Sequence, residues 1–152
     1  MNSACLSYLI YIGATAEKAW EALTSPQALK QYWGTIHSQW TVGSPVMEVS
    51  KSGKLLWRGE VRRSEPTRLL AFTMDVTGSG ETPTEVTFEL SPPVSKVTPN
   101  CPVVRLTATQ TGFDDHSKLR PECARAWPEI MSSIKTYIET GRPLPFAWHA
   151  EE

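Results

Sequence analysis

The feature that most limits how this chain can fold is an apolar stripe near its C-terminus. Apolar residues recur there at spacings of three and four, which is the periodicity of one face of an α-helix. Gly141 and Pro143 predict where this helix stops, and Pro128 inside it removes one backbone hydrogen bond. Because such a helix is stable only when its apolar face is buried, a second layer must cover it. The stripe consists of Cys123, Ala126, Trp127, Ile130, Met131, Ile134, Tyr137 and Ile138.

The second layer is predicted from the middle of the chain, where the apolar period changes to two. Short turns rich in glycine, proline and serine separate the alternating segments, which favours an antiparallel meander. In the last three segments one face is apolar and the other carries Thr, Arg, Asp and Glu, so the apolar face should lie against the C-terminal helix. The expected strands span residues 37–42, 45–51, 54–65, 67–77, 83–91 and 102–111.

A further strand and two short helices are expected before this meander. Residues 6–12 alternate and are rich in β-branched and aromatic types, as strands are. Thr15 is placed to cap a first helix, and Ser25 followed by Pro26 predicts the start of a second, with Gly34 near its end. The fold class is therefore α+β, in the order strand, two helices, six strands and one long helix.

Length and charge limit the classes of protein to which the chain can belong. Its 152 residues suit one domain, with a core at about residues 6–142 and a tail at 143–152. The net charge of −1 argues against nucleic acid as a partner, because phosphate binding requires an excess of basic residues. No apolar run approaches the ~20 residues of a membrane span, and no basic residue precedes the first apolar stretch, so a cytoplasmic protein is expected. Cys5, Cys101 and Cys123 are widely separated and indicate neither a disulfide framework nor a structural zinc site.

Several short segments occur in an order and at a spacing typical of one known group of proteins. They are AEKAWEALT at 16–24, LKQYW at 29–33, GEV at 59–61, RLLAFTM at 68–74, VTFEL at 86–90, LTATQTGF at 106–113, AWPEIM at 126–131 and ETG at 139–141. Over roughly residues 6–142 the chain resembles the START-like, or SRPBCC, superfamily, and more narrowly its activator of heat shock protein 90 ATPase homologue-like family. The resemblance implies a helix-grip fold, a curved antiparallel sheet of about seven strands wrapped round the C-terminal helix.

The resemblance also implies a cavity between the sheet and this helix that holds a small hydrophobic or amphipathic molecule, such as a lipid. Plain core packing is the alternative interpretation for each residue that would line it. Gln110 is the uncharged polar group on the inward face and needs a partner, whether backbone, water or ligand. The family often has tryptophan where this chain has Met74 and histidine where it has Gln110. The candidate ligand-binding residues are Trp33, Trp40, Trp57, Phe72, Met74, Phe88, Leu90, Gln110, Trp127, Met131 and Ile134.

Residue patterns typical of catalysis or metal binding are sparse. The acidic and imidazole cluster at 114–116 falls in an expected loop before the last helix, where capping or solvation accounts for it. His37 and His149 have no partner at a ligand spacing, and no nucleophile motif is present. Glu60 and Asp75 fall on the outward face of their strands. We therefore expect no catalytic residue, no metal and no cofactor.

Three functions remain open at this point. Binding of a small apolar or amphipathic molecule is the first. An interaction module related to the heat shock protein 90 ATPase activator, with a chaperone or another protein as partner and a role in the stress response, is the second. A polyketide cyclase-like enzyme is the third, although such chemistry needs acid–base groups in the pocket. Oligomeric state, monomer or homodimer, is left open. A basic stretch suits a solvated strand face or a protein contact: Lys51, Lys54, Arg58, Arg62, Arg63 and Arg68.

Overall fold

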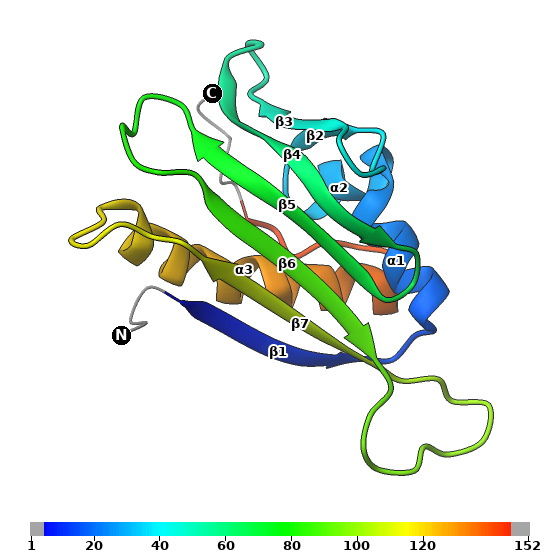
Figure 1. Cartoon of the computed structure of the whole chain (residues 1–152). Coiled ribbons are helices and arrows are strands. Elements are labelled where there is room, and N and C mark those ends of the chain that lie inside the picture. Colours follow the sequence, from blue (N-terminus) through cyan, green and yellow to red (C-terminus); the bar gives the residue numbers. More distant parts are fainter. Residues whose placement is uncertain (1–4, 147–152) are drawn as a thin grey trace.

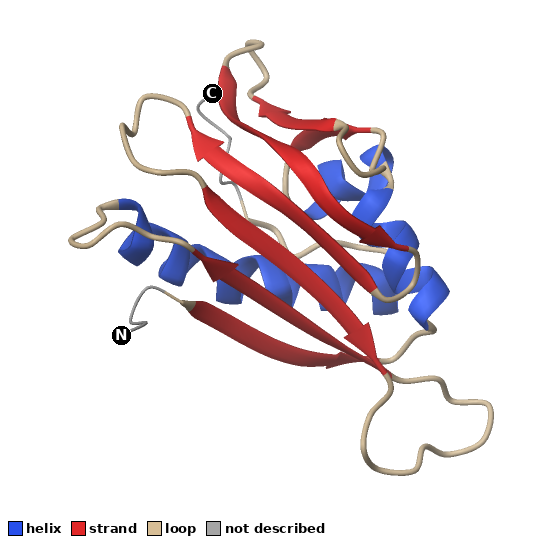
Figure 2. Cartoon of the chain, viewed as in Figure 1, coloured by secondary structure: helices blue, strands red, loops and turns tan. Residues whose placement is uncertain are grey.

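A curved sheet of seven antiparallel strands wraps round a long C-terminal helix in the computed structural model, which describes residues 5–146 (Figure 1). The strands lie in the order β1-β7-β6-β5-β4-β3-β2, so the first strand pairs with the last. The three helices cover the same face of the sheet (Figure 2). This is the helix-grip fold that the sequence predicted. The elements are β1 (Leu6–Ile12), α1 (Ala16–Thr24), α2 (Pro26–Tyr32), β2 (Thr35–Ser38), β3 (Pro45–Val49), β4 (Leu55–Glu65), β5 (Leu69–Val76), β6 (Thr84–Ser91), β7 (Val104–Thr111) and α3 (Leu119–Thr140).

Local signals in the sequence set the ends of the helices. Thr15 Oγ1 accepts a hydrogen bond from the amide three residues later at 3.1 Å, at the start of α1. Ser25 Oγ does the same for α2 at 3.3 Å, with Pro26 as the first helical residue. Gly141 follows α3 with a φ of 82°, in the left-handed region that glycine adopts easily. These predicted caps and stops are confirmed.

The strand expected at residues 37–42 is present but lies earlier, as β2 (Thr35–Ser38), because the chain turns after Ser38. Trp40 has a φ of 57°, which is incompatible with a strand. Its amide donates to Ser38 Oγ at 3.0 Å, and Ser64 Oγ donates to its carbonyl at 2.7 Å. These serine hydroxyls thus form hydrogen bonds with the amide and the carbonyl of Trp40 that would otherwise pair with a neighbouring strand. The other expected strands are confirmed, with ends that differ by at most two residues.

Gly59 marks a close approach between β4 and β5. A Cβ atom at this position would lie 1.7 Å from the carbonyl oxygen of Thr73, so only glycine fits. Thr73 Oγ1 accepts the amide of Glu60 at 2.9 Å, and the pairing register shifts between Val61 and Arg63. Irregularities of this kind bend a strand and increase its twist, which helps the sheet to curve round α3.

The apolar stripe of α3 faces the inside of the sheet. Trp127, Ile130, Met131, Ile134 and Ile138 are buried, as the periodicity predicted. None of the helices in the part of the chain that the structure describes is both long and apolar enough to cross a bilayer.

Pro128 interrupts the hydrogen bonding of α3, and a residue of β1 compensates. Proline has no amide N–H, so the carbonyl of Ala124, four residues earlier, lacks its usual helical donor. Tyr8 Oη donates to that carbonyl at 3.1 Å. Because an unsatisfied backbone carbonyl costs free energy, this bond ties the first strand to the last helix.

Replacing Tyr8 by Phe should lower the free energy of unfolding by about 1 kcal/mol, because the carbonyl of Ala124 loses its donor. In a Pro128→Ala background the new amide can donate to Ala124, so the same replacement should cost less. Urea unfolding of the four proteins in this double-mutant cycle measures the difference. Tyr11→Phe, in the same strand but with an exposed ring, is the control. An equal cost of Tyr8→Phe in both backgrounds would contradict the assignment.

The start of α3 is held by the turn between β5 and β6. Glu81 Oε2 accepts the amides of Lys118 and Leu119 at 2.9 and 3.3 Å, and Glu81 Oε1 accepts the hydroxyl of Ser117. Lys118, which precedes the helix, makes no side-chain cap of its own. The hydrogen bond from Ser117, supported by the two amides, lowers the pKa of Glu81. A remote carboxylate therefore serves as the cap of this helix.

Folding stability should depend on the ionisation of Glu81. Because its pKa is lowered in the folded state, the ionised carboxylate stabilises the fold above the ordinary value of 4.5, and this effect is lost as the pH falls through the lower folded-state value. Glu81→Gln should therefore cost more free energy of unfolding at about pH 6 than at about pH 3. Urea unfolding at both pH values tests this, with Ser117→Ala expected to reduce the same pH dependence. A cost that does not change with pH would refute the assignment.

Side chains of α3 also cover the backbone of β1. Lys135 Nζ donates to the carbonyl of Tyr11 at 2.7 Å and lies 2.7 Å from Glu139 Oε2. The same carboxylate oxygen accepts the amide of Gly13 at 2.6 Å. That amide, followed by Lys135, lowers the pKa of Glu139. The edge of the sheet is thus bound to the helix by a charged pair.

Candidate functional site

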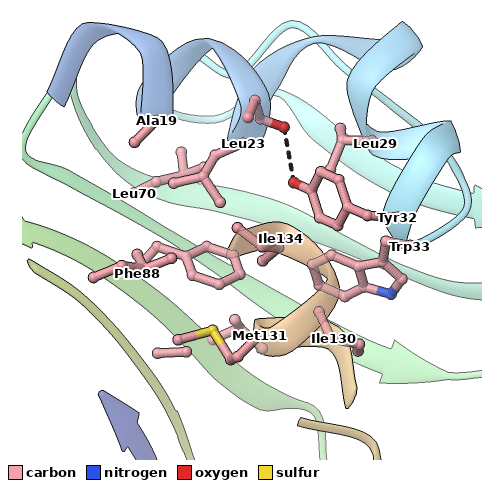
Figure 3. Packing of buried hydrophobic residues seen from close by; sticks show 14 of the residues in the cluster. Ala19, Leu23, Leu29, Tyr32, Trp33, Leu70, Phe88, Ile130, Met131 and Ile134 are labelled. Atoms are coloured by element: carbon pink, nitrogen blue, oxygen red, sulfur yellow. Dashed lines mark hydrogen bonds between the residues drawn. The ribbon is translucent and has the colours of Figure 1, made fainter. Parts of the chain in front are cut away.

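A cluster of aromatic rings lies between the sheet and α3. Its members come from the end of α2 (Trp33), from the loop after β2 (Trp40), and from three strands and α3, namely Trp57, Phe72, Phe88 and Trp127. Figure 3 shows Phe88 and Trp33 on either side of Ile134, with Met131 beneath Phe88 and with Leu23 and Leu29 above them. We call these six rings the aromatic cluster.

The rings of the cluster form a continuous series of contacts. Trp57 stacks on Phe72 with ring centroids 5.6 Å apart and planes 11° apart. Trp33 contacts Trp57, Phe88 and Trp127 at centroid distances of 6.3, 6.2 and 5.7 Å. The latter two contacts are edge-to-face, a geometry that aromatic quadrupoles favour. Trp40 reaches Phe72 from the rim at 5.8 Å. The inner surface of the sheet is therefore aromatic from its rim to the helix.

Gln110 joins α3 to the middle of the sheet beneath the cluster. Its Oε1 accepts the indole N–H of Trp127 at 2.8 Å, and its Nε2 donates to Thr84 Oγ1 at 2.9 Å. The Nε2 also lies 3.9 Å from the sulfur of Met74. Gln110 is 2% exposed, so this network is shielded from water. The partner that the sequence analysis required for this amide is thus supplied by side chains.

Glu48 on β3 is a buried carboxylate that the sequence analysis missed. It is 3% exposed, and its Oε1 accepts the indole N–H of Trp57 at 2.7 Å. The two residues are cross-strand partners on β3 and β4, so both side chains point to the inner face. The available signal was the alternation of β3, in which Val46 is buried and Met47 exposed. That alternation is misleading from sequence, because Met47 and Val49 form a more apolar face than Val46 and Glu48.

The comparisons with known proteins agree with this geometry. The family described as "Activator of Hsp90 ATPase homolog 1-like protein" matches residues 13–139. The chain belongs to this family. A comparison with curated proteins gave no match.

Several solved structures have a similar fold. DynU16, from the dynemicin biosynthetic locus, aligns with a TM-score of 0.77 at 20% identity over 93% of this chain, which spans about half of DynU16 (49%). The Aha1 dimer from Colwellia psychrerythraea aligns with a TM-score of 0.70 at 22% identity, over 90% of this chain and 97% of that one. Protein MLL2253 from Mesorhizobium loti gives 0.71 at 22% identity, over 86% and 95%. At identities this low, the TM-scores show a shared fold alone.

Most of the candidate ligand-binding residues named from the sequence lie close together between the sheet and α3. Ten of the eleven are buried and Trp40 is half-buried. Leu90 is the exception to the grouping, because it pairs with Leu106, four residues along β7 from Gln110, and borders a separate surface hollow of about 670 Å³ with Ala16 and Val104. Trp148 and His149 lie outside the described residues.

The acidic groups that the sequence analysis considered lie elsewhere. Asp114 Oδ2 accepts the amide of Thr82 at 2.8 Å, which lowers the pKa of Asp114 and confirms its structural role in a loop. Glu60 is exposed on the outer face, where it lies 3.8 Å from Arg62. Within residues 5–146, no group of three or more His, Cys, Asp or Glu residues is placed to hold a metal ion. Glu48 is therefore the acidic group that the fold brings to the aromatic cluster.

Replacing Gln110 by Met should lower the free energy of unfolding by about 1–3 kcal/mol, because the indole N–H of Trp127 would be buried without an acceptor. In a Trp127→Phe background that donor is absent, so the same replacement should cost clearly less. Thermal or urea unfolding of the cycle measures the coupling. Costs that simply add would show that the bond from Trp127 to Gln110 contributes nothing.

Proposed function

We propose that the protein binds a small hydrophobic or amphipathic molecule between the inner face of the sheet and α3. The observation that carries this proposal is the unbroken series of ring contacts from Trp40 at the rim to Trp127 on the helix. Ligand sites are typically lined by apolar and aromatic side chains with a few polar groups that fix orientation. Gln110 and Glu48 are the polar groups of this kind beside the cluster.

The exposure of the inward residues suggests where a ligand would enter. Trp33 and Met74 are each 9% exposed and Trp40 is half-buried, whereas Phe72 is 1% exposed. A ligand would meet the first three side chains before reaching the rest. Because the rings already contact one another, binding requires the rim side chains to move. Methionine is suited to such a position, since its flexible thioether adapts to different shapes.

Interaction with a chaperone is the second candidate function, and the family name is what supports it. A charged docking surface would favour it, and the basic stretch on and beside β4 is the obvious candidate. Its arginines, however, lie beside glutamates: Arg62 is 3.8 Å from Glu60, and Arg63 is 3.4 Å from Glu65. Such exposed pairs are typical of a solvated face and contribute little, although the two glutamates balance only two of the six basic residues in the stretch. Ligand binding stands first because the aromatic cluster is a structural observation, whereas the family name alone supports a chaperone as partner.

Methyl NMR of protein labelled with 13C at methionine methyl groups tests the proposal. Decyl glucoside, titrated below its micelle concentration, serves as a neutral amphipathic probe. We expect the signals of Met74 and Met131, which face the helix–sheet interior, to shift with the same dissociation constant. Met47 is exposed on the outer face of β3 and is the internal control. Shifts at Met47 alone, or none at any methionine with a series of alkyl probes, would refute the proposal.

A further inference from the structure

We propose that a surface hollow beside Trp20 and Trp40 binds a neutral sugar ring. The hollow has a volume of about 430 Å³ and lies where α1, the loop after β2 and the end of β4 meet. It is separate from the space between the sheet and α3, so this proposal goes beyond the proposed function and does not depend on it.

The first argument is the charge and the size of the hollow. Every described side chain that lines it is uncharged. Because a charged ligand gains affinity from an opposite charge at its site, a hollow without charges favours a neutral ligand. Its volume falls within the range of roughly 300–1,000 Å³ that is typical of small-molecule sites.

The second argument is the pair of indole rings. Trp20 on α1 and Trp40 after β2 are both half-buried and line the hollow together. Val42 beside them is 67% exposed, so the apolar surface reaches the solvent. One face of a pyranose ring presents mainly C–H groups, which pack against the negative faces of aromatic rings. The hollow therefore suits a ring with an apolar face.

The third argument is that the hollow offers hydrogen-bond donors and acceptors together. In the described part of the chain, the indole N–H groups of Trp20 and Trp40 have no hydrogen-bond partner, and neither is buried. Thr24 donates its hydroxyl proton to the carbonyl of Trp20 at 2.9 Å. Ser64 donates to the carbonyl of Trp40 at 2.7 Å. The lone pairs of both hydroxyl oxygens can therefore still accept, and the exposed amide of Gln39 can donate and accept. Sugar hydroxyls match such a set, because each of them both donates and accepts, whereas a carbonyl or an ether only accepts.

The backbone holds Trp40 in position without a ligand. Its φ of 57° is a value that bulky residues rarely adopt, and such conformations cluster at ligand sites. Ser38 Oγ accepts its amide at 3.0 Å, and Ser64 Oγ donates to its carbonyl. Its ring contacts Phe72 at a centroid distance of 5.8 Å. A ring that is already fixed loses little entropy when a ligand binds.

NMR of the full chain labelled with 15N tests the proposal, because the indole N–H signals report on individual tryptophans. Methyl glucoside, methyl galactoside and methyl mannoside are the probes, since they are neutral and lack a long alkyl chain. We expect at least one of them to shift the signals of Trp20 and Trp40 with a common dissociation constant. The signals of Trp57 and Trp127, whose N–H groups are already bonded inside the protein, should not move. Methyl glucuronide should bind no more tightly than methyl glucoside. Cyclohexylmethanol, a ring with a single hydroxyl group, should bind at least about threefold more weakly than the sugar.

Two variants and a matched control locate the site. Trp20→Phe keeps an aromatic ring and removes its N–H donor, and Gln39→Ala removes the exposed amide. Each should weaken binding of the sugar at least about threefold. Gln31→Ala, which alters an exposed glutamine of α2 outside the hollow, should change nothing. Because Gln39 is exposed, its variant tests the proposal even if Trp20→Phe does not fold.

Several outcomes would overturn the proposal. One is the absence of any shift with all three pyranosides, and another is tighter binding of methyl glucuronide or cyclohexylmethanol than of the sugar. Shifts at Trp57 and Trp127 as large as those at Trp20 would place the sugar in the interior and contradict the site. An effect of Gln39→Ala no larger than that of Gln31→Ala would do the same. None of these measurements uses the methionine signals that test binding between the sheet and α3, so failure of one proposal is distinguishable from failure of the other.

Discussion

The hydrogen bond from Trp127 to Gln110 is the buried directional contact that fixes how the long helix sits on the middle of the sheet. Apolar contacts are not directional, so an apolar stripe alone would allow α3 to shift or rotate on the apolar face of the sheet. The bond at 2.8 Å connects one helical residue to one residue of β7, and Thr84 on β6 holds the other end of the same amide. Polar networks of this kind favour one arrangement when every member is satisfied. The position of the aromatic cluster follows from it.

The cluster that forms the proposed site is also part of the hydrophobic core. Trp33, Phe88 and Trp127 contact one another directly, and each aromatic pair adds about 0.5–1.5 kcal/mol beyond area burial. The protein therefore does not need a ligand to complete its core. A ligand must compete with ring–ring contacts, so its headgroup has to supply interactions that the rings alone lack. Glu48 and Gln110 are the polar side chains beside the cluster that can provide them.

The order of the elements and the inward face of β5, β6, β7 and α3 were predictable, because their periodicity repeats over many residues. Local chemistry decided the differences. Trp40 lies outside β2 because two serine hydroxyls form hydrogen bonds with its backbone. The cap of α3 is Glu81, which is remote in sequence from the helix. Glu48 was missed because the opposite face of β3, with Met47 and Val49, is the more apolar one in sequence. Its burial becomes evident only once Trp57 lies opposite it.

The charged pair that covers β1 has a consequence for how the molecule meets its own copies. β1 is an outer strand of the sheet, and such strands can pair with strands of other molecules. Lys135 occupies the carbonyl of Tyr11, and Glu139 occupies the amide of Gly13. A foreign strand would have to displace both charges to extend the sheet there. The opposite outer strand, β2, is only four residues long. Extension of the sheet by strands of other molecules is therefore opposed at both outer strands.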